Sequence, residues 1–328
     1  MKRIIFAVLL VACFVSVAVA ADHPNYSAAR PDVVPAGKVA VHPFVNVPET
    51  MATSTTVFTS DYEDDAVWWF NTKGKELGSI TSGLANPQGL ATDGKASLYV
   101  ANTGANDVLI YKKPYTKTPT TLSASGWYPV GVAQFNNGEW VAATNIFATS
   151  GEAGSVLLYK NGKLVATVQN SSFYYYYFCA FDKDGNLFID GRNSSGDIVV
   201  GEIPGAAKGK QTLDVLTTNN SIEFPGGIAV NAKNQILIDD QEGFAVYTYN
   251  QPKKGSLGTP VDTTDLNGVG DPVTIALMCV DKDVWEADAS HLTLGEYAYP
   301  KGGNAVDTIT PSGAALLIGV AVVPASIP

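Results

Sequence analysis

The sequence predicts an all-β protein built as a six-bladed β-propeller. Three observations lead to this prediction: a short strand motif recurs along the chain, further strands follow each copy at a nearly constant offset, and the two chain ends supply complementary parts of one blade. Strand repeats with a period in the forties are typical of propeller blades.

The recurring motif is a short strand that ends in alanine. Clear copies are NPQGLA (86–91), YPVGVA (128–133) and FPGGIA (224–229), and degenerate copies are YYFCA (176–180), DPVTIA (271–276) and LIGVA (317–321). We call the glycine position of this motif the marker; it is occupied by Gly89, Gly131, Phe178, Gly227, Thr274 and Gly319, which are 42 to 49 residues apart. The innermost strands of a propeller converge on its axis, so small residues are expected there.

Further strands are predicted after each marker. Second strands are expected at LYVAN (98–102), WVAAT (140–144), LFIDG (187–191), ILIDD (236–240) and VWEAD (284–288). Third strands are expected to end at Tyr111, Tyr159, Tyr249 and Tyr299, and fourth strands are expected at KELGSIT (75–81), KLVATVQ (163–169) and QTLDVLTT (211–218). Each blade should therefore contain four strands.

The chain ends complete one blade. VFTSD (57–61) and AVWWF (66–70) match a second and a third strand without a first, whereas LIGVAVVPA (317–325) is a first strand without followers. Pairing of the C-terminal strand into the N-terminal blade would remove the open sheet edges. The propeller then spans residues 54–328, and the even spacing disfavours two small domains. A Pro-containing extension over residues 21–53 is interpreted as a linker or an external strap.

The first 20 residues have the pattern of a secretory signal peptide. Lys2 and Arg3 precede an apolar run, and the run ends with small residues that predict cleavage after Ala20. The mature protein is therefore expected to be secreted or periplasmic. An alternative is a lipoprotein anchored through Cys13, but the stretch after Cys13 stays apolar. No later apolar stretch is long enough to span a bilayer.

Charge and cysteine content limit the classes of partner. The formal net charge is −10, and no basic stripe of the kind that binds nucleic acid occurs. Cys179 and Cys279 fall on non-neighbouring blades, so two buried free thiols are expected rather than a disulfide. The oligomeric state is left open.

The segments NPQGLATDGKASLYVANTGANDVLIY (86–111) and FPGGIAVNAKNQILIDD (224–240) resemble NHL-type propeller repeats. They are also similar to the gluconolactonase and senescence-marker group, which are six-bladed hydrolases with a divalent metal on the axis. The resemblance implies that metal ligands stand just before each marker, and those positions hold Gln88, Val130, Tyr177, Gly226, Val273 and Ile318. Calcium needs several oxygen ligands, and this set offers only the Gln88 amide. We therefore expect no metal, no cofactor and no catalytic residue, and a metal-dependent lactone or ester hydrolase is the second hypothesis.

Acidic and amide residues end the second strands. Asp61, Asn102, Asp240 and Asp288 occupy equivalent places, with Asp64, Asp65, Asp239 and Glu242 nearby. These residues either cap turns by accepting backbone N–H groups or form a calcium site. Repetition once per blade favours capping.

The candidate ligand site is a set of aromatic residues at one mouth of the axial channel. Phe173 to Phe178 form an unbroken aromatic run, and Tyr174 to Tyr177 are expected to form the connection into the innermost strand of blade four. The residues three before the markers are Asn86, Tyr128, Tyr175, Phe224, Asp271 and Leu316. The predicted ligand-binding residues are Trp127, Tyr128, Tyr174, Tyr175, Tyr176, Tyr177, Phe224, Asp271 and Gln88. The alternative is that these rings plug the axis.

The aromatic mouth favours an exported, non-enzymatic binding or interaction protein. Aromatic faces beside a few polar groups suit a carbohydrate, a peptide or protein partner, or a small aromatic molecule. A third hypothesis is a structural component of an extracellular assembly, which the charged fraction of 16% and the uncommitted residues 21–53 suggest.

Overall fold

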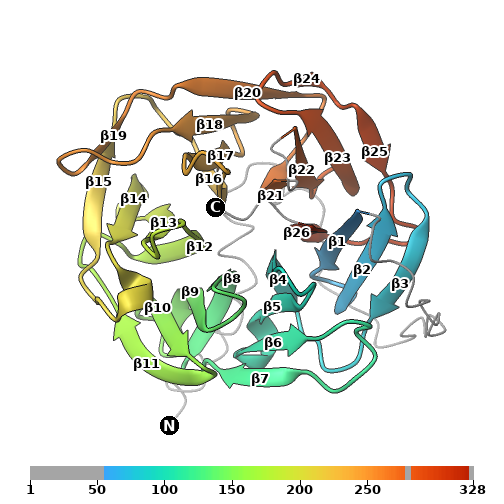
Figure 1. Cartoon of the computed structure of the whole chain (residues 1–328), viewed down its shortest axis with the longest axis horizontal. Helices are drawn as coiled ribbons and strands as arrows, with labels where there is room; N and C mark the ends of the chain where they lie inside the picture. Colours follow the sequence, from blue (N-terminus) through green and yellow to red (C-terminus); the bar gives the residue numbers. More distant parts are fainter. Residues whose placement is uncertain (1–54, 278–281, 325–328) are drawn as a thin grey trace, which may run out of the picture. The chain divides into compact units, whose positions relative to one another are not determined.

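A computed structural model describes residues 55–277 and 282–324, which belong to one compact unit, residues 43–328. They form six β-sheets arranged in a ring, which is the predicted six-bladed β-propeller (Figure 1). The expected signal peptide, the extension over residues 21–53 and Cys279 lie outside the described residues. In the described part, helix is confined to the short segments η1 (Thr103–Ala105) and η2 (Ala206–Lys208), and neither is long enough to cross a membrane.

Each blade contains four antiparallel strands. From the axis outward, blade one contains β26 (Leu317–Val323), β1 (Thr56–Asp61), β2 (Ala66–Asn71) and β3 (Glu76–Ile80). Blade two contains β4 (Pro87–Thr92), β5 (Leu98–Asn102), β6 (Asp107–Tyr111) and β7 (Thr120–Ser123). Blade three contains β8 (Trp127–Phe135), β9 (Trp140–Ala148), β10 (Ala153–Lys160) and β11 (Lys163–Val168).

The other three blades follow the same order. Blade four contains β12 (Tyr175–Phe181), β13 (Leu187–Arg192), β14 (Ile198–Ile203) and β15 (Asp214–Thr218). Blade five contains β16 (Pro225–Val230), β17 (Ile236–Asp240), β18 (Ala245–Tyr249) and β20 (Asp262–Asn267). Blade six contains β21 (Pro272–Leu277), β22 (Asp283–Asp288), β23 (Thr293–Ala298) and β25 (Asp307–Ile309).

The predicted closure of the ring is confirmed. The C-terminal strand β26 pairs antiparallel with β1, so that Thr56 faces Val323 and Phe58 faces Ala321. Figure 1 shows the last strand, in red, beside the first strand, in blue. Because β26 pairs with β1, the inner edge of β1 is covered, and β26 takes the innermost place next to the axis, as β4 does in blade two.

Two short strands add a feature that the repeat pattern does not contain. β19 (Ser256–Gly258) leaves blade five and pairs in parallel with β15 of blade four. β24 (Gly303–Asn304) likewise leaves blade six and pairs with β20 of blade five. These strands give blades four and five a fifth strand and connect three consecutive blades along the outside of the ring.

The core lies between neighbouring blades. At the interface of blades three and four, Ala133 packs with Cys179 and Phe181, and at that of blades two and three, Ala91 packs against the cluster that contains Val132. The alanine of one innermost strand thus meets a larger side chain of the next, which explains the alanine in the motif. Cys179 is a buried free thiol, and burial raises its pKa to about 12, so the thiolate is rare at neutral pH.

The marker glycine is required by the close approach of innermost strands. A Cβ at Gly89 would lie 2.6 Å from the backbone oxygen of Val130 and 3.0 Å from Cα of Gly131, both in the next blade. These contacts are with backbone atoms, which cannot move aside as a flexible side chain would. The convergence of the innermost strands therefore selects glycine at this position.

Substitution of this glycine should destabilise the ring. We expect Gly89→Ala to lower the free energy of unfolding by about 1–3 kcal/mol, the usual cost of overpacking. Thr121→Ala, on the exposed outer strand β7 of the same blade, is the control and should stay within about 0.5 kcal/mol of the unmodified protein. Urea unfolding of both variants measures the difference, and equal stabilities would contradict the packing argument.

Candidate functional site

The acidic residues that end the second strands cap backbone groups. Asp240 accepts hydrogen bonds from the N–H groups of Glu223, Phe224 and Gly243. Asp61 accepts from Ala315 N and Leu316 N, and Asp288 accepts from Gly270 N and Asp271 N. Each side chain holds the loop that leads into an innermost strand, as the capping interpretation expects. In residues 55–277 and 282–324, no three His, Cys, Asp or Glu side chains are arranged to hold a metal ion.

The aromatic run does not form the connecting loop that the sequence predicts for Tyr174 to Tyr177. β12 already begins at Tyr175, three residues before the marker. Successive side chains of a strand point to opposite faces. Tyr175 and Tyr177 accordingly share one face, with ring centroids 6.3 Å apart and an interplanar angle of 14°. Tyr176 points the other way.

Tyr176 belongs to the core between blades three and four. It is fully buried, stacks on Phe173 at 4.8 Å between ring centroids, and donates its hydroxyl hydrogen to the backbone oxygen of Asn170. This placement separates Tyr176 from the other residues of the predicted site. Phe173 and Tyr176 anchor the strand, and the rings beside them are held in place as a result.

Five rings contributed by blades three to five form a continuous row, which we call the aromatic mouth. Its members are Phe147, Tyr174, Tyr175, Tyr177 and Phe224. Phe147 contacts Tyr174 and Tyr175 edge-on, with ring centroids 6.2 and 5.0 Å away. At the other end, Tyr177 stacks on Phe224 at 5.7 Å.

Exposure divides the aromatic mouth into two parts. Tyr174, Tyr175 and Phe147 are half-buried, whereas Tyr177 and Phe224 are buried. The hydroxyl of Tyr174 donates to the backbone oxygen of Gly151. Solvent therefore reaches the outer rings, and the inner rings pack against them.

Two members of the aromatic mouth region do not follow from the sequence motif. Phe147 lies near the end of β9, and Arg192 ends β13 with its guanidinium 5.3 Å from the centroid of the Phe224 ring. Arg192 also donates from Nε to the backbone oxygen of Gly196. Both come from second strands, whereas the motif covers only the residues around each marker. β9 extends to Ala148, beyond the predicted WVAAT, and this extension carries Phe147.

The other predicted site residues are spread around the channel. Trp127 and Tyr128 are half-buried at the start of β8, and Trp127 packs against the core between blades two and three. Gln88 is buried on β4, where its backbone oxygen accepts a hydrogen bond from Ser60 Oγ. Asp271 is buried just before β21.

Buried carboxyl groups lie on the second strands of blades four to six. Asp190 accepts a hydrogen bond from Phe178 N through Oδ1, but its Oδ2 has no hydrogen-bond partner. Neither carboxyl oxygen of Asp239 has one, and this side chain lies against Gly226, in the space that a side chain there would occupy. Burial raises the pKa of Asp190 and of Asp239 well above its ordinary range, and repulsion from Asp240, Asp190 and Asp271 raises that of Asp239 further.

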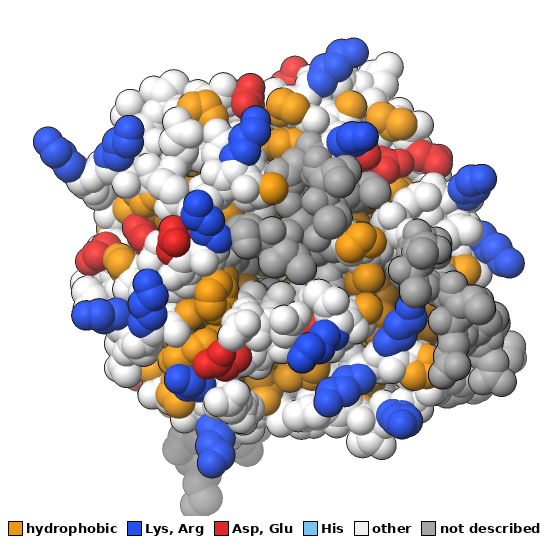
Figure 2. Space-filling model, in the orientation of Figure 1, with side chains coloured by type: hydrophobic (Ala, Val, Ile, Leu, Met, Phe, Trp, Pro, Cys, Tyr) orange, Lys and Arg blue, Asp and Glu red, His pale blue; other side chains and the backbone are white. Residues whose placement is uncertain are grey.

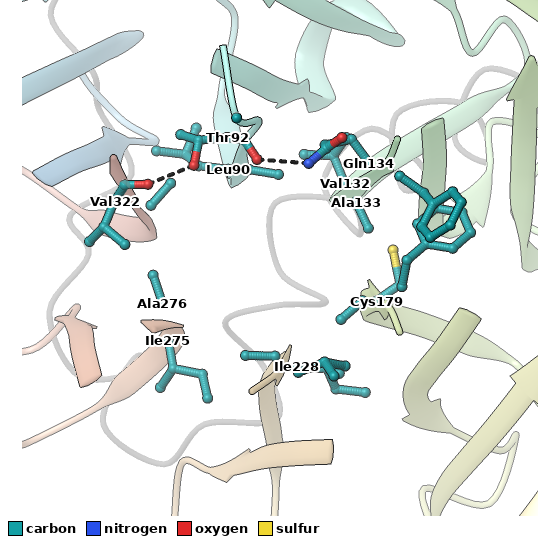
Figure 3. A pocket seen from close by; sticks show the side chains of 18 of the residues that line it. Leu90, Thr92, Val132, Ala133, Gln134, Cys179, Ile228, Ile275, Ala276 and Val322 are labelled. Carbon is teal, nitrogen blue, oxygen red and sulfur yellow. Dashed lines mark hydrogen bonds between the residues drawn. The ribbon is translucent and has the colours of Figure 1, made fainter. Parts of the chain in front are cut away.

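The opposite end of the channel holds a cavity of about 420 Å³ (Figure 3). The residue that directly follows each marker lines this cavity. These residues are Leu90, Val132, Cys179, Ile228, Ile275 and Val320. Thr92 Oγ1 donates to Val322 O over 2.6 Å, and Gln134 Nε2 donates to Thr92 O over 3.0 Å. These two hydrogen bonds connect neighbouring blades, and Asn136, Asn137 and Lys183 also line the cavity.

Charge alone marks no binding surface on the visible face. Figure 2 shows Lys and Arg side chains standing apart from one another, with acidic side chains among them.

Comparisons with known proteins support the fold. No protein-family model matches the sequence, and no curated protein matches it. A chain in the crystal structure of a nidogen/laminin complex is similar with a TM-score of 0.64 at 15% identity, over 82% of this chain and 98% of that one. A protein of unknown function from Bacteroides caccae has a TM-score of 0.61 at 11% identity, over 82% and 99%. Hydrazine synthase from Kuenenia stuttgartiensis has 0.53 at 13%, over 74% and 72%. At these identities the likeness concerns the propeller fold.

Proposed function

We propose that this protein is a non-enzymatic binding propeller that takes its ligand at the aromatic mouth. The observation that carries the proposal is the group of Tyr174, Tyr175 and Phe147, whose rings contact one another at the channel end yet stay half-buried. Such rings offer flat apolar faces with hydroxyl groups at their edges. That surface suits the ring of a carbohydrate, an apolar peptide side chain or a small aromatic molecule.

Other rings of this region are packed in the interior of the protein. Tyr176 and Phe173 fill the space between blades, and Tyr177 and Phe224 are buried beneath the outer rings. Packing of these four rings gives the outer group a fixed geometry. A preorganised site costs less conformational entropy when the ligand binds.

We also propose that the protein acts outside the cytoplasm, since residues 1–20 have the pattern of a signal peptide. The nidogen/laminin structure, which shares the propeller fold, is a complex between proteins. A protein partner at the mouth is therefore included among the ligands to be tested.

Removal of an outer ring should weaken binding more than stability. For a ligand found by screening neutral oligosaccharides and apolar peptides, we expect Tyr174→Ala and Tyr175→Ala each to cost about 1 kcal/mol or more, which is about fivefold in affinity. Isothermal titration calorimetry measures the affinity, and thermal unfolding measures the stability of each variant.

Two further variants separate binding from packing. Tyr247→Ala removes a half-buried tyrosine from the third strand of blade five, so affinity should be unchanged. Tyr176→Ala removes a fully buried ring and should cost about 3–5 kcal/mol of stability. The proposal fails if Tyr174→Ala and Tyr175→Ala bind as the unmodified protein does, or if no oligosaccharide or peptide of the screen binds.

A further inference from the structure

A second cavity, separate from the aromatic mouth, lies between blades five and six. Its volume is about 270 Å³. One side is formed by Asn267, at the end of β20, and by Val269 of the connection to β21. The other side is formed by residues of β22, β23 and β25. A space of this size holds a small polar molecule of several heavy atoms, since one water molecule takes about 30 Å³ in the liquid.

Glu286 of β22 lines this cavity from within the sheet. Glu286 is 1% exposed, and its carboxyl oxygen Oε2 has no hydrogen-bond partner. Gly295 stands opposite on β23, and a Cβ there would lie 2.6 Å from Oε1 of Glu286. The missing side chain at position 295 therefore leaves room for the carboxyl group. A buried oxygen without a partner costs free energy, so a donor that reaches Oε2 from the cavity is bound favourably.

The surroundings of Glu286 are anionic. Asp288, which is 1% exposed, also lines the cavity, and its Oδ2 lies 2.7 Å from Nδ1 of His291. Burial raises the pKa of Glu286 well above its ordinary range, and repulsion from the carboxylates of Asp288, Asp239 and Asp271 raises it further. No Lys or Arg is among the described residues that line the cavity, and Tyr297 is the remaining titratable one.

We propose that this cavity is a binding site for a small organic cation, a primary ammonium or a guanidinium group, whose N–H groups bond to the Glu286 carboxylate. The cation supplies both the positive charge and the donors that the buried carboxyl lacks. The hydroxyl groups of Thr293, Thr308 and Tyr297 line the same space and accept further N–H groups. When the cation binds to protonated Glu286, the carboxyl proton is released to solvent, so the charge in the cavity stays the same.

Proton release makes the affinity depend on pH. Where Glu286 is protonated in the free protein, the affinity for the cation should rise as the pH rises, by up to about tenfold per pH unit. The imidazole of His291 also lines the cavity, with Nδ1 2.7 Å from Oδ2 of Asp288. A His291→Asn variant removes this group, and a pH dependence that survives the substitution belongs to Glu286.

Methylguanidinium and methylurea provide a matched pair of probes, because they have nearly the same shape and differ in charge. Calorimetric titration of the full chain at pH 6, 7 and 8 should show binding of methylguanidinium and at least tenfold weaker binding of methylurea. Glu286→Gln should lower the affinity at least tenfold and abolish the pH dependence. Glu296→Gln changes the same charge one residue from Gly295, but Glu296 does not line the cavity, so it should bind as the unmodified protein does.

Three results would overturn the proposal: equal affinity for methylurea, no binding of methylguanidinium at any of the three pH values, or unchanged affinity in Glu286→Gln. The comparison of the two probes needs only the unmodified protein, so it decides the matter even if a variant does not fold. Because the aromatic mouth is not involved, Tyr175→Ala should leave methylguanidinium binding unchanged. A failure of the proposed mouth would therefore not be confused with a failure of this site.

Discussion

Removal of residues 314–328 is expected to abolish the cooperative unfolding of the propeller. The deletion removes β26, which pairs with β1 and is the innermost strand of blade one. Leu317, Val320 and Val322 pack with Trp285 and Trp68 in the core between blades six and one. The loss of these three side chains costs about 1.5–3 kcal/mol each, and the sum is comparable to the whole stability of a typical domain, about 5–15 kcal/mol.

The deletion also leaves polar groups without partners. Asp61 is fully buried and accepts hydrogen bonds from Ala315 N and Leu316 N, and Thr274 Oγ1 donates to Ile318 O. Breaking these bonds adds the cost of buried unpaired groups to the lost packing. The open edge of β1 would then be free to pair with another chain, so aggregation is expected.

Calorimetry and light scattering would measure both effects. Deletion of residues 325–328 leaves β26 intact and is the matched control, which should melt close to the full chain. A synthetic peptide of residues 314–328, added during refolding, should restore part of the cooperative transition. If the shortened chain melts at the temperature of the intact protein without the peptide, the closure of the ring does not stabilise the fold.

Stability should fall as the pH rises from 5 to 8. In the folded protein, burial raises the pKa of Asp190, Asp239 and Glu286 well above its ordinary range. In the unfolded chain these carboxyl groups lose their protons near pH 4. Between the unfolded and the folded pKa the folded state binds more protons, so the free energy of unfolding decreases as the pH rises. The stabilisation that these three groups provide is fully present below about pH 4. It is lost as the pH rises through their folded-state pKa values, at up to about 1.4 kcal/mol per pH unit for each group.

Neutral isosteres provide the test. A triple variant with Asp190→Asn, Asp239→Asn and Glu286→Gln should show a flatter dependence of stability on pH, and it should be more stable than the unmodified protein at pH 8. Burial and repulsion from Asp283 and Asp307 raise the pKa of Glu296 to about 7, so Glu296 changes the stability in the same direction. Because Glu296 is half-buried, Glu296→Gln should remove only a small part of the slope. Urea unfolding at pH 5 and 8 measures the difference, and equal stability of the unmodified protein at both values would contradict the expectation.

Local repetition in the chain was sufficient to predict the blades. Each blade repeats the same strand order, so the spacing of markers such as Gly89 and Gly131 reveals six copies, and the unmatched strands at 57–70 and 317–325 reveal how the ring closes. The position of the caps followed for the same reason, because Asp61, Asp240 and Asp288 meet the same geometric need in blades one, five and six. A requirement that recurs at a regular interval is visible without coordinates.

The composition of the candidate sites depends on contacts between different strands. The aromatic run looks uniform, and only the start of β12 at Tyr175 determines which rings face the mouth and which face the core. Phe147 and Arg192 join the mouth from second strands, which the motif around each marker does not include.

Glu286 appears as one acidic residue in a strand, yet the close approach of β22 and β23 at Gly295 leaves room for its carboxyl group beside a cavity. The repeat determines where each strand runs, because that depends on local pattern. The closure of the ring determines which side chains meet across blades, because that depends on how residues distant in the chain pack around the axis.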